Sequence, residues 1–111
     1  MLKVLRVTGN SMSPMLLPKD LILIRTKCKN FRPGEVVVFN CKILGLVVKR
    51  ISSNTKEVVQ LAGDNPRLDS SVCNKDLDIR GILGKVIGIW RRPFRINRVK
   101  RKLYRKHDLS H

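Results

Sequence analysis

A serine near the start of the chain lies in a setting typical of a nucleophile. The segment around it reads Gly9-Asn10-Ser11-Met12-Ser13-Pro14. Small turn-forming residues precede Ser11 and a proline follows it three positions later, which predicts a turn. A serine hydroxyl attacks a carbonyl carbon only when a neighbouring base takes its proton. Assigning this chemistry to Ser11 therefore requires a base elsewhere in the chain.

Histidine is the usual base for a catalytic serine. This chain has two histidines, His107 and His111, and both lie at its C-terminal end beside a run of cations. We therefore expect neither a Ser-His-Asp triad nor a Cys-His pair. Lysine remains as the candidate base.

Lys49 is the lysine that best fits the role of base. An amine accepts a proton only in its neutral form, and burial favours that form. Lys49 follows the apolar run ILGLVV and precedes Arg50. In a strand, Lys49 shares one face with Val47 and Ile51, whereas Arg50 lies on the other. We expect Lys49 to point into the core and Arg50 to face water; an exposed lysine at a strand end is the open alternative.

Short apolar runs separated by turn residues predict the elements that hold these groups. The runs cover residues 2–7, 21–26, 36–40, 43–51, 58–63 and 78–90. Their lengths and regular spacing predict a mainly β fold, a small coiled antiparallel β-barrel or sandwich. The chain has 111 residues, of which 42% are hydrophobic and 5% aromatic, enough for one domain with a mainly aliphatic core. Glycines in the last run suit bends or bulges.

The C-terminal part of the chain is strongly basic. The whole chain has a net charge of +16, and residues 91–111 carry nine Lys or Arg residues and one acid, Asp108. We predict a β-domain over residues 1–93 and a basic tail over residues 94–111. Val99 and Leu103 are four positions apart, so the tail is either a short amphipathic helix or disordered. It would bind acidic surfaces weakly.

Several segments, in order, resemble the type I signal peptidases and the related self-cleaving proteases of the SOS-repressor type. They are GNSMSPMLLPKDLILI, RPGEVVVF, VVKRI, LAGDNPRLDSS and RGILGKVIGIWRRP. Their order and spacing are similar to those of the family from about residue 6 to residue 93. Short members with GDNP occur among the maturation proteases of nickel-type superoxide dismutase, and the chain is most similar to that subgroup.

The resemblance implies a serine endopeptidase with a Ser/Lys dyad, in which Ser11 is the nucleophile and Lys49 the general base. The residues that it places in the turn and oxyanion hole are Gly9, Asn10, Met12 and Pro14. The residues that it places in a structural box supporting the site are Asp64, Asn65, Asp69 and Ser70. The backbone N–H of Ser11 would donate to the developing oxyanion.

The chain departs from the family pattern at several positions. Gly9 stands where the family has a hydroxyl residue, and Lys19 stands where it has glycine. Glu35 replaces an aspartate, Arg67 a serine and Ser71 an arginine. A second oxyanion donor must then come from a residue other than Gly9. The hydroxyl that orients the lysine in the family would then be either missing or supplied by Ser70.

The resemblance also implies a substrate, a protein precursor with an N-terminal leader, in particular that of nickel superoxide dismutase. We expect no metal and no cofactor, because Cys28, Cys41 and Cys73 are widely spaced and form no CxxC pair. No apolar run approaches the ~20 residues of a membrane-spanning helix. The N-terminus lacks the pattern of a signal peptide, so we expect a cytoplasmic protein.

Other function classes stay open at this point. One is a processing protease of the signal peptidase or SOS-repressor type with a different substrate. Another is a non-enzymatic nucleic-acid-binding protein, which the net charge favours. The low aromatic content weighs against base stacking and therefore against this class.

Overall fold

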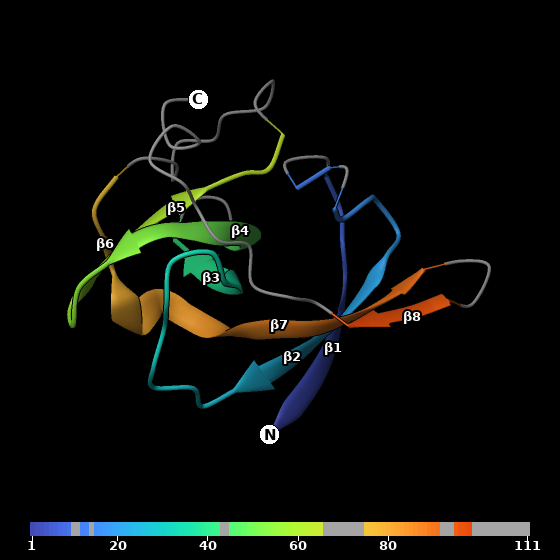
Figure 1. The fold of residues 1–111 in the computed structure, drawn as a ribbon, viewed down its shortest axis with the longest axis horizontal. Helices are drawn as coiled ribbons and strands as arrows, with labels where there is room; N and C mark the ends of the chain where they lie inside the picture. Colours follow the sequence, from blue (N-terminus) through green and yellow to red (C-terminus); the bar gives the residue numbers. More distant parts are fainter. Residues whose placement is uncertain (10–11, 14, 43–44, 66–74, 92–94, 99–111) are drawn as a thin grey trace.

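The protein is a small antiparallel β structure (Figure 1). The computed structural model describes residues 1–9, 12–13, 15–42, 45–65, 75–91 and 95–98. In chain order the elements are β1 (Leu2–Arg6), β2 (Leu21–Thr26), β3 (Val36–Cys41), β4 (Gly45–Asn54), β5 (Val58–Ala62), β6 (Leu77–Asp78), the 3₁₀ turn η1 (Ile79–Gly81), β7 (Ile82–Arg91) and β8 (Arg95–Arg98).

All of these strands belong to one sheet. The strand order is β1-β2-β7-β3-β4-β5-β6, and β8 pairs with β7. Every pairing is antiparallel. Figure 1 shows the sheet curled, with β3 to β6 on one side and β1, β2, β7 and β8 on the other. The predicted mainly β, coiled antiparallel fold is confirmed, and each of the apolar runs contains a strand.

The central strand β3 is buried on both faces, which explains its uninterrupted VVVF sequence. Val36 and Val38 belong to one hydrophobic cluster, with residues of β2, β7 and the segment after β1. Val37 and Phe39 belong to a second cluster, with residues of β4 and β5. Strands covered on both sides are apolar at successive positions rather than at alternate ones. The curl of the sheet therefore gives a chain of this length two small cores.

Bulges in β7 lie where its glycines allow a close approach of the backbones. The β2–β7 register shifts opposite Gly88 and Val86, and the β3–β7 register shifts next to Gly84. A Cβ atom added at Gly84 would lie 2.5 Å from the carbonyl oxygen of Arg25. The predicted use of glycine in this run is thus confirmed, since a side chain at Gly84 would push β2 away.

The C-terminal part of the described chain has two features beyond the pattern of apolar runs. The run 78–90 is not a single strand, because η1 turns the chain between β6 and β7. The first residues of the predicted tail, Arg95–Arg98, form β8 and extend the sheet beyond residue 93. The helix considered around Val99 and Leu103 lies outside the described residues.

In the part of the chain that the structure describes, no helix has the length and apolar character needed to cross a membrane.

Candidate active site

Lys49 is buried in β4, as expected. Only 2% of its surface is exposed, and its Cα atom is paired with that of Val37 across the β3–β4 ladder. None of the ion pairs among the described residues involves Lys49. Lys49 lines a cavity of about 430 Å³, together with Val38 and Val48 of the two strands. Lys49 is therefore a buried amine at the edge of a space large enough for a peptide side chain.

The other wall of this cavity is the segment that carries the candidate nucleophile. Thr8, Gly9 and Met12 line the cavity together with Lys49. Met12 is buried in the first hydrophobic cluster, and its carbonyl oxygen accepts a hydrogen bond of 3.0 Å from the N–H of Leu16. Ser11 itself lies outside the described residues. The residues that flank it on both sides nevertheless border the space that Lys49 borders.

Gly9 has a backbone conformation that explains its departure from the family pattern. Its φ is 151°, in the range that glycine adopts without strain. A serine or threonine here would meet no atom within 4 Å of its Cβ, so backbone strain rather than space disfavours it. The hydroxyl group nearest in sequence is that of Thr8, which lines the same cavity.

Arg50, next to Lys49, is buried, and the prediction that it faces water is wrong. Its Nε donates to Asp64 Oδ1 at 2.8 Å and its Nη2 donates to Asp64 Oδ2 at 2.7 Å. Its Nη1 donates to the carbonyl oxygen of Gly34 at 2.8 Å. Val48, on the same face of β4, packs against the first hydrophobic cluster. Both faces of β4 are therefore covered, because the sheet curls and the segment after β1 folds over it.

A second arginine, Arg91, holds the same segment from β7. Its Nε and Nη2 donate to the carboxylate of Asp20 at 2.7 to 3.1 Å, and Nη2 also donates to the carbonyl oxygen of Met15 at 2.9 Å. Burial by itself raises the pKa of Asp20, but hydrogen bonds from Arg91 and from the N–H of Leu17 outweigh it, so that the pKa lies below its ordinary value. Arg91, the first of the basic residues counted over 91–111, is thus part of the fold.

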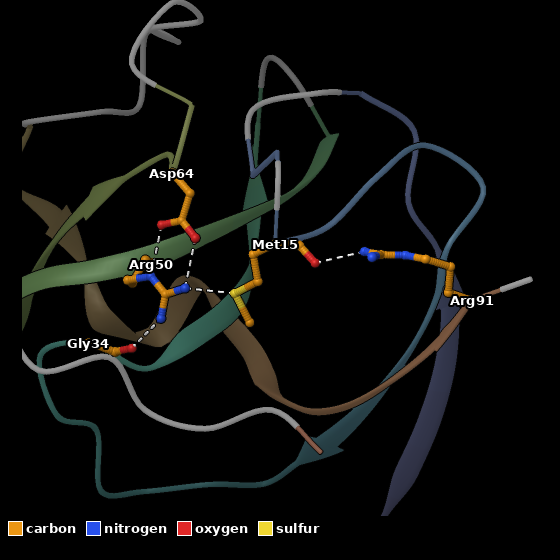
Figure 2. A network of polar contacts seen from close by, with 5 residues as sticks. All are labelled: Met15, Gly34, Arg50, Asp64 and Arg91. Carbon is orange, nitrogen blue, oxygen red and sulfur yellow. Dashed lines mark hydrogen bonds and ion pairs between the residues drawn. The ribbon is translucent and has the colours of Figure 1, made fainter. Parts of the chain in front are cut away.

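Met15 joins the two arginine networks (Figure 2). Its sulfur accepts a hydrogen bond of 2.7 Å from Arg50 Nη2, while its carbonyl oxygen accepts from Arg91. Charge-assisted hydrogen bonds are stronger than neutral ones and hold their partners in defined positions. Met15, four residues after Ser11 in the sequence, is therefore held by side chains of two strands, β4 and β7.

The structure brings together part of the predicted site. Lys49, Gly9 and Met12 share a cavity, and Asp64 holds Arg50, the neighbour of Lys49. Asn65 follows Asp64 and is partly buried. The remaining predicted residues lie outside the described part of the chain: Asn10, Ser11, Pro14, Asp69 and Ser70.

Sequence reasoning missed Asp20, Met15 and the structural roles of the two arginines. Arg91 and Asp20 are 71 positions apart, so no local pattern pairs them. One general signal was present: the chain has 8 acids against 24 Lys and Arg residues. In a chain with so many cations, a buried acid such as Asp20 is expected to pair with a basic side chain.

Two other departures from the family pattern, Glu35 and Lys19, have structural counterparts, whereas Arg67 and Ser71 lie outside the described residues. Glu35, which replaces aspartate, forms an ion pair of 3.0 Å with Lys85 of β7 and accepts a hydrogen bond from the N–H of Arg32. Lys19, which replaces glycine, has a φ of 75°, in the left-handed region that favours glycine. Lys19 thus has the backbone conformation expected of glycine, with the steric strain that this conformation causes in a residue with a side chain.

The family model described as Peptidase S24-like matches residues 1–87. These residues include Ser11, Lys49 and Asp64, and the match ends within β7. A search of curated proteins found no significant match.

Proposed function

We propose, since the chain belongs to the Peptidase S24-like family, that it is a serine endopeptidase in which Ser11 is the nucleophile and Lys49 the general base. The family supports a Ser/Lys type of peptidase in general. The assignment of the two residues, and the substrate named below, are the finer parts of the proposal.

One observation carries the assignment. Lys49 is buried and borders the same cavity as Gly9 and Met12, which precede and follow Ser11 in the sequence. A buried amine without an ion pair to another described residue costs stability. Natural proteins retain destabilising residues of this kind at functional sites. Both histidines of the chain are at its C-terminal end, beyond the residues that form this cavity.

The proposed chemistry proceeds in two stages. Neutral Lys49 takes the hydroxyl proton of Ser11 while the serine oxygen attacks the carbonyl carbon of the scissile bond. The backbone N–H of Ser11 donates to the oxyanion that forms. Lys49 then gives the proton to the leaving amine, and an acyl-enzyme ester remains. A water molecule, deprotonated by Lys49, hydrolyses the ester and restores Ser11.

The proposed substrate is a protein precursor with an N-terminal leader, and specifically the precursor of nickel superoxide dismutase. A leader is an extended segment, which suits binding beside a strand. The cavity lies where β1 runs into the Ser11 segment, opposite residues of β3 and β4. The space beside Lys49 would accept one side chain next to the cleaved bond.

Two variants test the dyad. Ser11→Ala removes the nucleophile, and Lys49→Met removes the base while keeping an unbranched side chain of similar size. With the leader-bearing precursor as substrate, each is expected to lower kcat/KM by roughly 10⁴-fold or more. Cleavage is followed by mass spectrometry of the new N-terminus.

Lys56→Met is the matched control, because Lys56 is an exposed lysine in the turn between β4 and β5. It should cleave like the unmodified protein. Cleavage by Lys49→Met at more than half of the normal rate would contradict a lysine base. If the precursor is not cleaved but a peptide library is, in a manner dependent on Ser11 and Lys49, the dyad stands and the leader substrate is wrong.

The family match also favours a second candidate, self-cleavage of the SOS-repressor type with the same dyad. The scissile bond would then lie in the same polypeptide. The two candidates differ in kinetics. The rate constant of self-cleavage does not depend on protein concentration, whereas the rate of leader removal is proportional to enzyme concentration.

A further inference from the structure

A second concave surface lies beside the loop between β1 and β2. Its volume is about 630 Å³, and we call it the Arg6–Trp90 groove. Arg6, Leu21 and Trp90 line it as direct neighbours across β1, β2 and β7. Leu17, Pro18 and Lys19 of the loop form its other side. The groove therefore has a wall of sheet and a wall of loop.

The groove carries positive charge. Arg6 and Lys19 are exposed, and neither takes part in the ion pairs among the described residues. Arg91 lines the groove as well. The one acid in the lining, Asp20, is buried and already accepts hydrogen bonds from Arg91 and Leu17. An anionic group in the groove would thus meet two available cations.

The groove is also partly apolar. Trp90 is 48% exposed and Leu17 is 36% exposed, although both are large hydrophobic residues. Pro18 and Leu21 add to the same lining. A single aromatic ring among aliphatic groups suits an apolar side chain better than a stack of bases, which requires successive aromatic platforms.

The backbone of β1 offers hydrogen-bonding groups to a peptide at this place. The N–H of Thr26 donates to Met1 and the N–H of Val7 donates to Asp20, so odd-numbered residues of β1 bond to β2. In an antiparallel pair the alternate residues point their N–H and C=O groups the other way. Those of Val4 and Arg6 therefore point to the outer edge, where no described strand pairs with β1.

From these features we propose that the Arg6–Trp90 groove binds an acidic, extended peptide segment of a partner protein. Carboxylates of the peptide contact Arg6 and Lys19, and an apolar side chain packs on Trp90. The groove shares Arg6 with the Lys49 cavity, so a bound segment can continue towards that cavity. The proposal does not rest on the peptidase activity, because binding requires neither Ser11 nor Lys49.

Trp90 is the only tryptophan of the chain, so its fluorescence reports directly on the groove. The full chain carrying Ser11→Ala is titrated with a hexapeptide of alternating glutamate and leucine, and with the matched glutamine–leucine peptide. We expect a saturable change in Trp90 emission with the acidic peptide only. Raising the salt concentration to 0.5 M should weaken it, since salt screens exposed charges.

Charge variants locate the binding. Arg6→Gln with Lys19→Gln should raise the Kd for the acidic peptide at least tenfold, whereas Lys56→Gln with Lys75→Gln, an equal change of charge at exposed positions outside the groove, should leave it unchanged. As a second test that keeps strong charges, Arg6→Glu with Lys19→Glu should bind a lysine–leucine peptide instead. Circular dichroism checks that each variant is folded.

Three results would overturn the proposal. One is equal binding of the glutamine–leucine peptide. Another is an unchanged Kd in folded Arg6→Gln, Lys19→Gln protein, which would place acidic peptides elsewhere on the chain. The third is a Trp90 response to phosphatidylglycerol vesicles or to oligothymidine without a response to the acidic peptide, which would assign the groove to a membrane or to nucleic acid.

Discussion

Two ends of the molecule use the same arginine–aspartate pair in opposite surroundings. At the candidate site, Arg50 and Asp64 are 3% and 12% exposed, whereas at η1 Arg80 and Asp78 are 88% and 54% exposed. In both pairs the shortest contact is 2.7 Å. Contact distance therefore does not distinguish them, but the access of water does.

The difference lies in what each pair holds. Arg50 also bonds to Gly34 and Met15, so its loss would leave several buried groups without partners. Arg80 bonds to Asp78, whose carboxylate also accepts a hydrogen bond from the N–H of Arg80 within the three-residue turn. Exposed ion pairs contribute little to stability, while removing one member of a buried pair is strongly destabilising. The site end should therefore be sensitive to substitutions that the η1 end tolerates.

The largest expected effect is that of Arg50→Met. It leaves the Asp64 carboxylate without its cation in a partly buried place, and it frees Met15. We expect the free energy of unfolding to fall by about 3–5 kcal/mol, measured by urea denaturation. Adding Asp64→Leu should restore much of the loss, because no unpaired charge remains. A fall below about 1 kcal/mol would mean that water replaces Arg50 without cost.

Asp20→Asn is expected to have the next largest effect, about 2 kcal/mol at neutral pH, through the loss of charge-assisted bonds to Arg91. The folded-state pKa of Asp20 is lowered, so its stabilisation is complete above the unfolded value of about 3.9 and is lost as the pH falls through the folded value. Urea denaturation should show the same difference in unfolding free energy at pH 7 and pH 5, and a smaller difference at pH 3. A difference independent of pH would refute the role of the carboxylate charge.

Lys19→Gly should raise stability by about 1 kcal/mol, because glycine adopts the left-handed backbone without strain. The gain is reduced by the greater freedom of glycine in the unfolded chain. Lys27, with a φ of 60° after β2, is the comparison, and Lys27→Gly should give a similar gain. A loss of stability in Lys19→Gly alone would show that the Lys19 side chain makes a contact worth more than the strain.

The smallest expected effect is that of Asp78→Asn, whose urea midpoint at neutral pH should match that of the unmodified protein. The hydrogen bond from the Arg80 side chain, with that from its N–H, lowers the pKa of Asp78 to about 2. Asp78 and Arg80 are exposed and two positions apart, so the same pair can form in the unfolded chain and adds little to stability. Arg80→Gln should raise the pKa of Asp78, as measured by NMR titration. A clear fall in the midpoint of Asp78→Asn would remove the contrast between the two ends.

The strands were predictable because their signal is local. Runs such as LILIRT and VVVFN identify β2 and β3 without knowledge of their partners. The turn η1 was not predicted, because three residues are too few to show a periodicity of their own. Arg50 was assigned to the wrong environment because alternation along a strand identifies two faces but does not say whether both are covered.

The candidate site was predictable to a similar degree. The burial of Lys49 follows from the apolar run that precedes it, and the structure confirms that burial. The contacts of Met15 with Arg50 and Arg91 depend on three distant parts of the chain and on the curl of the sheet. Neither composition nor spacing contains that information, because it arises only when the two small cores are assembled.

The double burial of β3 has a consequence for how the protein opens. β3 is hydrogen-bonded to β4 on one edge and to β7 on the other, and its side chains fill both cores. Its amide hydrogens can exchange with deuterium only when the whole molecule unfolds, so their exchange rate measures the global opening free energy. The outward amides of Leu2 and Val4 in β1 exchange by local fluctuation. Of these two strands, β1 therefore opens by local motion, whereas β3 separates only when the whole molecule unfolds.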